Sequence, residues 1–508
     1  MAKSGDAQAI LHQAVASHRS GDLDRARRLY RKCLKRHPDN ADALHFLGLL
    51  ESQANRSDEA EKLFSQAVAS MRRSGGSNPN YDHALNNLGN AYRANGKLER
   101  ALDAYREVLC RAPDNAMVLN NAGIVLKDMG ELAEARQHFL RAVALVPGYV
   151  EAHANLGNVY RQQGLLDDAV KAYRKALALD GGHAGAHINL AHTLLALGDY
   201  EQGWREYEWR WKANRWKRRP YRFRDWKGDD AGDKTVLVFA EQGVGDELMF
   251  ASCYGDLAAR AGHVVVECDP RLEALFSRSF PAMTCRGMDR SSEVAEWLQE
   301  VPAPDVQVAA GTVPLYLRPG PDSFPSQEGY LVADPDRVAD WRNRYRALGP
   351  GFRVGISWRG GSVPADRRAR SLDLMQWQEI FTVPGVTFVN LQYGDCREDI
   401  ELARNRLGVE VHHWEDANPL KDMDSFAAQI QALDLVLSID NSTVHMAGAL
   451  GAETWVMQPF AGDWRWRQGE ESSCWYPSLR QFWQPRPGDW DAVKASVARE
   501  LARRAGGR

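Results

Sequence analysis

The amino-acid sequence predicts a multidomain protein with an all-α solenoid at its N-terminus and an α/β region after it. Three observations predict this fold class. Turn residues recur about every 34 residues over the first 200 positions, as in stacked helical repeats. After residue 229, apolar β-branched runs alternate with helical stretches, which is the pattern of parallel sheets. The length of 508 residues is also too great for a single hydrophobic core.

The composition excludes several classes of protein. With 44% hydrophobic and 26% charged residues, the chain has the balance of a globular protein and not of a disordered one. A net charge of −3 excludes a protein that is basic all over and coats nucleic acid. No apolar run approaches the length of about 18 residues that spans a membrane, and the first ten residues lack the apolar core of a signal peptide. We therefore expect a cytoplasmic protein. The seven cysteines have no CxxC spacing, which predicts free thiols rather than disulfides or a structural zinc site.

Three positions keep the same phase through the N-terminal repeats. Five residues after each turn residue stands a small residue, and nine residues after it stands Tyr or Phe. Each unit therefore reads as helix A, a tight turn and helix B, and it cannot bury its apolar face without its neighbours. The spacing widens once to 41, through an insertion of seven residues near 74–79. The turn residues are Gly21, Asn55, Gly96, Gly130, Gly164 and Gly198.

This pattern resembles the tetratricopeptide repeat (TPR) over about residues 7–211, and we predict a solenoid over 1–211. A second register has the same period and falls on helix A, which lines the concave groove in this repeat class. Its members are Asn87, Asn121, Asn155 and Asn189. A column of amides suits the backbone of an extended peptide, so we predict an acceptor peptide-binding site. The column resembles the asparagine ladder of eukaryotic O-GlcNAc transferases. The alternative is that each asparagine only bonds the neighbouring turn.

The junction between the two regions is basic and aromatic. Residues 204–227 contain ten Lys or Arg and five Trp. Such a mixture is able to grip single-stranded nucleic acid or a membrane surface. The favoured interpretation is a packed seam of arginines stacked on tryptophans, because the run continues the sixth repeat in phase. We predict a junction over 212–228 and no nucleic-acid partner.

The α/β region divides into two halves, 229–335 and 336–485, followed by a C-terminal helix over 486–508. Parallel sheets bind ligands at the carboxyl ends of their strands, where polar loops follow each apolar run. A full GxGxxG motif is absent, because only Gly243 and Gly245 are present, so dinucleotide binding is weakly supported. The predicted strands are 235–240, 263–268, 305–310, 353–358, 386–392, 434–439 and 454–458.

Six motifs together carry a further resemblance. They are EQGVGDELMF, VGISWRGG, DRRARSL, LQYG, SIDNSTVHMAGALG and DWRW…SCWYPSLRQF. From about residue 200 to 495 the chain resembles bacterial TPR-linked glycosyltransferases, which are similar to lipopolysaccharide heptosyltransferases and to protein O-glycosyltransferases. The resemblance implies a GT-B fold, in which two Rossmann-like halves face each other and the C-terminal half holds a nucleotide-sugar donor. It also implies inverting transfer without a metal or cofactor. One relative of this type glycosylates flagellin.

The resemblance gives Asp246 the role of catalytic base for the acceptor hydroxyl; the alternative is a helix cap. Asp440 and His445 match the donor motif of the related family. Helix-opening amides suit a phosphate, and arginines are able to neutralise the leaving group. The predicted donor-binding residues are Trp358, Arg359, Arg368, Arg370, Gln392, Asp440, Asn441, Ser442, Thr443 and His445.

The sequence therefore predicts a glycosyltransferase that moves a sugar to Ser or Thr of a protein held in the TPR groove, with flagellin as one candidate acceptor. Two alternatives stay open. The first alternative is a non-catalytic TPR scaffold or chaperone with a degenerate transferase domain. The second is a transferase that acts on lipid-linked glycans.

Overall fold

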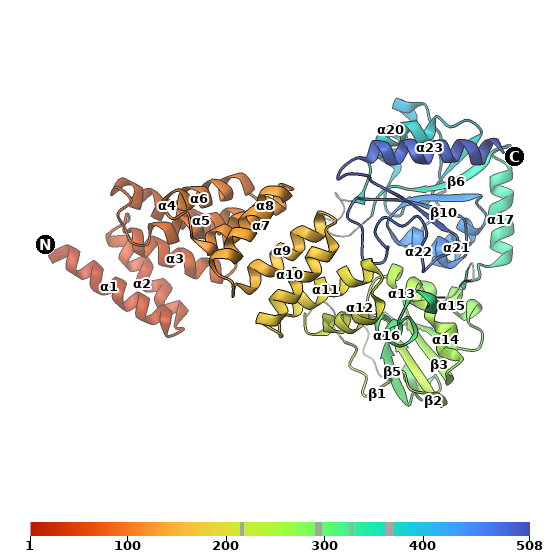
Figure 1. Ribbon diagram of the computed structural model, residues 1–508, viewed down its shortest axis with the longest axis horizontal. Helices are drawn as coiled ribbons and strands as arrows, with labels where there is room; N and C mark the ends of the chain where they lie inside the picture. The colour runs from red at the N-terminus through yellow and green to blue at the C-terminus, as the bar shows by residue number, and fades with distance from the viewer. Residues whose placement is uncertain are drawn as a thin grey trace. The chain divides into compact units, whose positions relative to one another are not determined.

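The computed structural model describes residues 2–213, 218–289, 297–324, 326, 329–360 and 370–507 (Figure 1). The chain divides into two compact units, Met1–His183 and Ala184–Arg508, each with its own hydrophobic clusters. The unit boundary lies inside the range 1–211 that the repeat pattern predicts for the solenoid. The reason is that α11 (Ala184–Leu197) and α12 (Tyr200–Tyr207) contribute to the core of the second unit. The finer domain boundaries at 212, 229, 336 and 486 stay predictions.

The described part of the first unit is built of helices alone, and consecutive helices pack in pairs. This confirms the predicted all-helical solenoid. Two of the prolines, Pro38 and Pro113, stand just after the ends of α2 and α6. Proline has no backbone N–H and disfavours a helical residue before it, which explains why both helices end there. The helices are α1 (Ala2–Arg19), α2 (Leu23–Arg36), α3 (Ala41–Gln53), α4 (Ser57–Arg73), α5 (Tyr81–Ala94), α6 (Leu98–Arg111), α7 (Ala116–Met129), α8 (Leu132–Leu145), α9 (Val150–Gln162) and α10 (Leu166–Leu179).

The turn residues of the repeats have a left-handed backbone. In this unit φ is +57° at Asn55 and between +72° and +90° at the four glycines Gly21, Gly96, Gly130 and Gly164. Such values favour glycine, with asparagine as the best tolerated substitute. The recurring Gly in the sequence is thus explained by the chain reversal between helix A and helix B.

A glycine inside helix A lets the aromatic ring of helix B approach. A Cβ atom built on Gly89 would lie 2.5 Å from the Tyr105 ring, and one built on Gly157 would lie 2.5 Å from the Tyr173 ring. Both rings are fully buried. In these two repeats the helix A glycine and the helix B aromatic ring therefore form one packing unit within the helix pair.

The second unit opens with α11, α12 and a 3₁₀ turn, η1 (Glu208–Trp211), whose aromatic side chains pack into its core. The Trp204 indole donates to the Arg318 carbonyl at 3.0 Å, and both side chains are 1% exposed. The Arg210 guanidinium lies over the rings of Tyr207 and Trp211, at 4.8 and 4.4 Å from their centroids. The described part of the junction is thus built as a packed seam, the arrangement favoured from sequence.

Two parallel sheets follow, which confirms an α/β region after the solenoid. The first sheet has the order β1-β5-β2-β3-β4, and the second has the order β11-β10-β9-β6-β7-β8. The strands of the first sheet are β1 (Arg224–Asp225), β2 (Ala231–Phe239), β3 (Ala261–Cys268), β4 (Thr284–Gly287) and β5 (Val306–Ala309). Those of the second are β6 (Phe352–Ser357), β7 (Val386–Asn390), β8 (Val411–His412), β9 (Leu435–Ile439), β10 (Thr454–Gln458) and β11 (Leu479–Trp483).

All seven predicted strands are present, with ends shifted by a few residues, whereas β1, β4, β8 and β11 are additional. Helices lie between the strands, as the alternating pattern predicts. The main ones are α13 (Val244–Phe250), α14 (Tyr254–Ala258), α15 (Glu273–Ser279), α16 (Val313–Leu317), α17 (Pro335–Arg346), α19 (Gln378–Phe381), α20 (Arg397–Leu407), α21 (Met423–Gln431), α22 (Ser442–Ala449) and α23 (Trp490–Gly506).

Candidate active site

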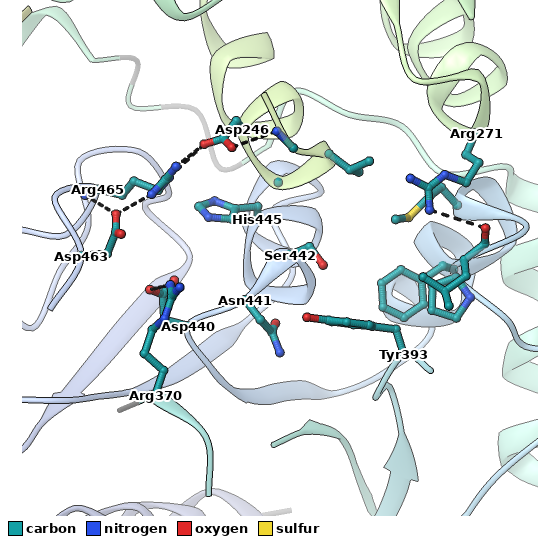
Figure 2. A pocket seen from close by; sticks show the side chains of 17 residues that line it. Asp246, Arg271, Arg370, Tyr393, Asp440, Asn441, Ser442, His445, Asp463 and Arg465 are labelled. Atoms are coloured by element: carbon teal, nitrogen blue, oxygen red, sulfur yellow. Dashed lines mark hydrogen bonds and ion pairs between the residues drawn. The ribbon is translucent and has the colours of Figure 1, made fainter. Parts of the chain in front are cut away.

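A cavity of about 550 Å³ lies in the second unit where the loops after several strands meet. Such a volume suits a small-molecule ligand. Its walls come from both sheets: the turn after β2 and Arg271 from the first, and the loops after β6, β7, β9 and β10 from the second. Figure 2 shows the labelled side chains converging on this space. The cavity lies at the carboxyl ends of parallel strands, the edge at which open sheets bind ligands.

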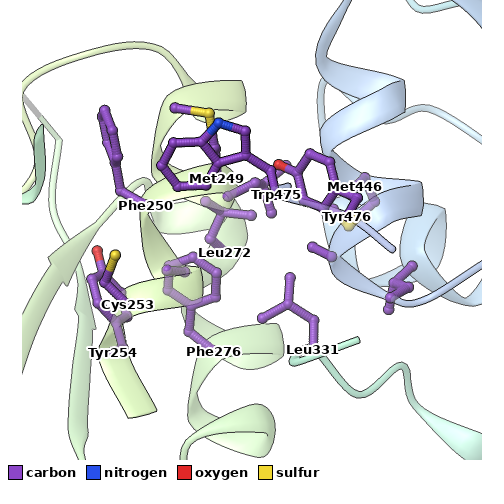
Figure 3. Packing of buried hydrophobic residues seen from close by; sticks show 14 of the residues in the cluster. Met249, Phe250, Cys253, Tyr254, Leu272, Phe276, Leu331, Met446, Trp475 and Tyr476 are labelled. Atoms are coloured by element: carbon purple, nitrogen blue, oxygen red, sulfur yellow. The ribbon is translucent and has the colours of Figure 1, made fainter. Parts of the chain in front are cut away.

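Hydrophobic packing fastens the two halves beside the cavity. Met249 and Phe250 of α13 belong to one buried cluster with Met446 of α22 and with Trp475 and Tyr476 (Figure 3). Each of these five side chains is 3% exposed or less. Burial of this much apolar surface holds α13 against α22, so that residues from both helices face the same space.

A glycine permits the close approach of the two helix starts. A Cβ atom on Gly245 would lie 3.1 Å from the His445 ring and 3.6 Å from the Cα atom of Ser442. A side chain at this position would require the His445 ring or the first turn of α13 to shift by a few tenths of an ångström. Gly245, which the sequence singled out as half of an incomplete GxGxxG motif, therefore serves close packing between the halves.

The turn that carries Asp246 is held from behind by the junction. Glu241 and Gln242 precede it and are both buried. Arg210 donates to both Glu241 oxygens, at 3.0 and 3.2 Å, and the Tyr207 hydroxyl donates to the Gln242 carbonyl oxygen at 3.0 Å. Burial raises the pKa of Glu241 above its ordinary value, and Arg210 opposes that rise. The seam thus fixes the backbone that leads into the candidate catalytic turn.

Asp246 lines the cavity and uses both of its carboxylate oxygens. Its Oδ2 atom accepts the Gly243 backbone N–H at 3.2 Å, which is a helix cap. Its Oδ1 atom accepts two N–H groups of Arg465, from Nε at 3.2 Å and from Nη2 (Figure 2). Asp246 is therefore a cap, as the alternative had it, and it also faces a cationic group from the other half. Whether it acts as a base stays a prediction.

Arg465 and Asp463 are the main site residues that sequence reasoning missed. Both line the cavity from the loop after β10, and Nη1 of Arg465 donates to Oδ1 of Asp463. Burial alone would raise the pKa of Asp463, but the guanidinium groups of Arg465 and Arg370 outweigh it and hold that pKa below its ordinary value. The Arg465 guanidinium also lies 4.5 Å from the centroid of the Trp464 ring. Arg465 belongs to the DWRW motif that the sequence singled out, but the motif's arginine was not given a role.

The start of α22 forms the wall of the cavity next to α13. Asn441 is its N-cap, and its Oδ1 accepts the Thr443 N–H at 3.0 Å. Its amide points inward and donates to the Ser357 hydroxyl at 2.7 Å and to the Arg359 carbonyl at 3.1 Å. Asn441 and Ser442 line the cavity, whereas Thr443 is fully buried behind them. The cavity is thus bordered by the N-terminal end of this helix, which favours an anion.

His445 lies in the cavity wall next to Arg465. Its ring stacks on Trp466 with centroids 5.4 Å apart, and its Nδ1 atom shares a hydrogen bond of 2.9 Å with the Tyr476 hydroxyl. Burial, together with the nearby Arg465 cation, lowers the pKa of His445 to about 4. The imidazole is therefore neutral near pH 7 and has one N–H to donate.

Arg370 and Asp440 form a third charged pair in the cavity. Nη1 of Arg370 donates to Oδ2 of Asp440 at 3.1 Å. Burial would lower the pKa of Arg370, but Asp440 and Asp463 raise it, so the guanidinium stays charged. Arg368, also predicted to bind the donor, lies outside the described residues.

Besides Thr443, three predicted donor-binding residues do not line the cavity. Trp358 is fully buried in the core and donates through its indole to Asp399 at 3.0 Å. Gln392 is 4% exposed, and its Oε1 accepts the backbone N–H groups of Trp358 and Arg359 at 2.9 and 2.7 Å. Arg359 donates to the Asp395 carbonyl at 2.7 Å. These residues brace the loops after β6 and β7, because the side chains at those strand ends turn into the protein.

Gln392 borders a second hollow of about 290 Å³, which shares Pro419 and Leu420 with the main cavity. Other cavity-lining residues had no role assigned from sequence, because no motif includes them: Arg271, Met423 and Phe426. Tyr393 also lines the cavity and belongs to the LQYG motif.

The predicted asparagine column ties successive repeats together. Nδ2 of Asn121 donates to Oδ1 of Asn86 at 2.8 Å, and Nδ2 of Asn155 donates to Oδ1 of Asn120 at 3.0 Å. Nδ2 of Asn87 is likewise 2.9 Å from Nε2 of His45 in the preceding repeat. These three asparagines are half-buried. The fourth, Asn189, lies in α11, in the second compact unit.

The amides of Asn87, Asn121 and Asn155 therefore bond helix A of the preceding repeat, and not the neighbouring turn that the alternative expected. Their use in peptide binding stays a prediction.

Two features are absent from the described residues. No group of three or more His, Cys, Asp and Glu side chains is arranged to hold a metal ion among them. Of the helices described, none has the length and apolar character to cross a membrane.

Comparison with known proteins identifies the N-terminal repeats. Models of the tetratricopeptide repeat match residues 7–50, 39–114, 114–181 and 160–203. This confirms the TPR array, a class of solenoid that presents an extended surface to protein partners. The chain is also 34% identical over 322 residues to Protein FlbA of Caulobacter vibrioides. That alignment covers 61% of this chain and 54% of FlbA, so the chain spans about half the length of this relative.

Several solved structures are similar to part of the chain. The crystal structure of MamA is 26% identical, covers 34% of this chain and 96% of its own, and has a TM-score of 0.30. A thermophilic TPR protein of Thermus thermophilus is 26% identical, with 37% and 99% coverage and a TM-score of 0.30. YrrB, described as a TPR protein with an unusual peptide-binding site, is 21% identical, with 35% and 88% coverage and a TM-score of 0.31.

Proposed function

We propose that this chain is a GT-B glycosyltransferase that moves a sugar from a nucleotide-sugar to a Ser or Thr hydroxyl of a protein acceptor. The observation that carries the proposal is the cavity between the two sheets. It brings a carboxylate of the first half, Asp246, to the same space as the start of α22, Arg370 and His445 of the second half. This set combines a proton acceptor with groups that stabilise a leaving phosphate.

Each group has a role in the proposed reaction. The acceptor hydroxyl attacks the anomeric carbon of the donor sugar, and the bond from that carbon to the phosphate oxygen breaks. The hydroxyl proton goes to Asp246, and the bonding electrons leave with the phosphate. Arg370 neutralises the phosphate charge. The Tyr476 hydroxyl donates to Nδ1 of His445, so the neutral imidazole carries its proton on Nε2. This N–H donates a hydrogen bond to a phosphate oxygen of the donor.

The two hollows suit the two parts of such a donor. The phosphate and sugar fill the main cavity, and the nucleoside extends toward the hollow beside Gln392, with which the cavity shares Pro419 and Leu420. The TPR array holds the protein acceptor, and flagellin is one candidate because a relative of the resembling family modifies it.

The test is nucleotide release from a panel of nucleotide-sugars, measured by chromatography with and without flagellin as acceptor. We expect one donor to be turned over faster with a protein acceptor, and the acceptor to gain the mass of the sugar on Ser or Thr. Asp246→Asn removes the base, whereas Asp233→Asn is a matched control on an exposed residue outside the cavity. No release from any donor, or equal release from wild type and Asp246→Asn, contradicts the proposal.

A further inference from the structure

The charges that line the cavity are already paired with one another. Its arginines are Arg271, Arg370 and Arg465, and its aspartates are Asp246, Asp440 and Asp463. Arg370 pairs with Asp440, and Arg465 pairs with both other aspartates. Arg271 pairs with Asp269 just outside the lining. An anionic ligand therefore shares an arginine with a carboxylate that already holds it, or displaces that carboxylate.

Arg465 differs from the other two arginines because its ion pair crosses from one half to the other. It belongs to the loop after β10, and Asp246 belongs to the turn after β2. The side chains of this pair are only 16% and 14% exposed, so water screens their attraction weakly. Asp463, on the same loop as Arg465, and the stacked Trp464 ring hold the guanidinium from its own side.

This pair occupies most of the hydrogen-bonding positions of Asp246, and three N–H groups of Arg465 are engaged by Asp246 and Asp463. A carboxylate has about four lone-pair positions, and three of those on Asp246 accept hydrogen bonds: two from Arg465 and one from Gly243. A base needs a lone pair that faces the acceptor hydroxyl. A leaving phosphate, in turn, needs a cation that is free to bind it.

We propose that Arg465 is a donor-operated switch: the donor phosphate takes over its guanidinium and thereby releases Asp246 for the acceptor hydroxyl. The inference rests on the proposed function and adds an order to it, in which the donor binds before Asp246 is free to act. Asp463 keeps its bond to Nη1 and anchors the guanidinium during the exchange. A planar guanidinium with five N–H donors is able to serve a carboxylate and a phosphate at once.

The switch predicts the direction in which each substitution changes the affinity for the phosphate. Asp246 and the phosphate compete for Arg465, so removal of the Asp246 charge tightens phosphate binding. This increase in affinity requires the Arg465 guanidinium. We expect Asp246→Asn to bind the anion roughly 5-fold more tightly than wild type or better. Arg465→Gln binds it more weakly. In the double variant the Asp246 substitution has no further effect on affinity.

The experiment is calorimetric titration of the full chain with inorganic pyrophosphate and with CMP, UDP, ADP and GDP. The four proteins are wild type, Asp246→Asn, Arg465→Gln and the double variant, with Asp233→Asn as a control for charge alone. The expected cycle shows tightening by Asp246→Asn in the wild-type background and none beside Arg465→Gln. Equal tightening in both backgrounds overturns the switch, because it shows simple repulsion of the anion by Asp246.

Two checks keep the outcome interpretable. Each variant is melted without anion, and Arg465→Lys replaces the glutamine variant if Arg465→Gln does not fold. Lysine keeps the charge but lacks the fork that serves two carboxylates, so the coupling between the two sites should shrink without vanishing.

The two proposals are contradicted by different results. If none of the five anions binds wild type, the donor site and the switch both fall. If an anion binds but the cycle is additive, only the switch falls.

Discussion

The sharpest structural prediction concerns the buried pair of Arg210 and Glu241 behind the candidate catalytic turn. The two side chains are each 1% exposed, and the guanidinium donates to both carboxylate oxygens. Arg210→Met keeps the length of the side chain but leaves Glu241 buried without its cation. Breaking a buried pair from one side costs about 3–5 kcal/mol of unfolding free energy. Glu241→Gln added to Arg210→Met removes the stranded charge, so the double variant should lose less than about 2 kcal/mol.

The free energy that Arg210→Met costs depends on pH through the titration of Glu241. Burial already raises the pKa of Glu241, and loss of Arg210 raises it further. A carboxyl group with a raised folded pKa favours the folded state at low pH and loses that contribution as pH rises through the folded pKa. The penalty of Arg210→Met should therefore shrink as pH falls from 7 toward 5.

The assay is urea unfolding followed by tryptophan fluorescence. Arg205→Met is the matched control on α12, because its surface pair with Glu201 is 67% and 64% exposed and should contribute less than about 1 kcal/mol. A single variant that costs under about 1 kcal/mol, or a double variant that costs as much as the single one, would refute the reasoning.

Three further predictions follow from the site and the solenoid. Asp246→Asn should lower sugar transfer roughly 100-fold; wild-type turnover would leave the residue as a cap alone. Asn121→Ala with Asn155→Ala should weaken acceptor binding roughly 10- to 30-fold and spare nucleotide binding, whereas unchanged acceptor affinity would make the column purely structural. Since the pKa of His445 falls to about 4 on folding, wild type should lose on the order of 3 kcal/mol of stability as pH falls from 6.5 to 4. His445→Gln should lose less over that interval, and superimposable stability curves for the two proteins would contradict a buried neutral imidazole.

The strands that the sequence missed share one position in the fold. The two sheets end at β1 and β4 and at β11 and β8, and these four are the ones without a predicted counterpart. The predicted strands lie inside the sheets, where burial on both faces demands a continuous apolar run. The edge strand β11 (LRQFW) is not a continuous apolar run, because its buried Gln481 donates to the backbone carbonyls of Glu470 and Ser472. Two of the four have only two residues each, too few to show a pattern.

The site was predictable where a residue follows a strand and its motif has a known counterpart. Asp246, Arg370, Asp440 and His445 all line the cavity. Trp358 is fully buried and does not line the cavity, because sequence position does not tell which way the side chain at a strand end turns. Arg465 was missed for a related reason. Its loop runs between β10 and β11, and its ion pair joins residues 219 positions apart, a contact that no local pattern predicts.

The solenoid was predictable in greater detail because each repeat reports on the same packing. The turn residues and the aromatic rings recur in one phase over six units, and the helix A glycine recurs in four of them, so many positions support one interpretation. The asparagine column shows the limit of such reasoning. A shared phase predicts a shared environment, but Asn121 and Asn155 use their amides to bond the repeat before them.

The central claim is that the cavity between the two sheets binds a nucleotide-sugar donor through its phosphate. The most direct measurement is calorimetric titration of the full chain with the free nucleotides, comparing wild type, Arg370→Ala and the exposed control Arg260→Ala. The account predicts that one nucleotide binds wild type and the control alike, and that Arg370→Ala binds it roughly 10-fold more weakly. Equal affinity of Arg370→Ala and wild type, or no binding of any nucleotide to wild type, would contradict the claim.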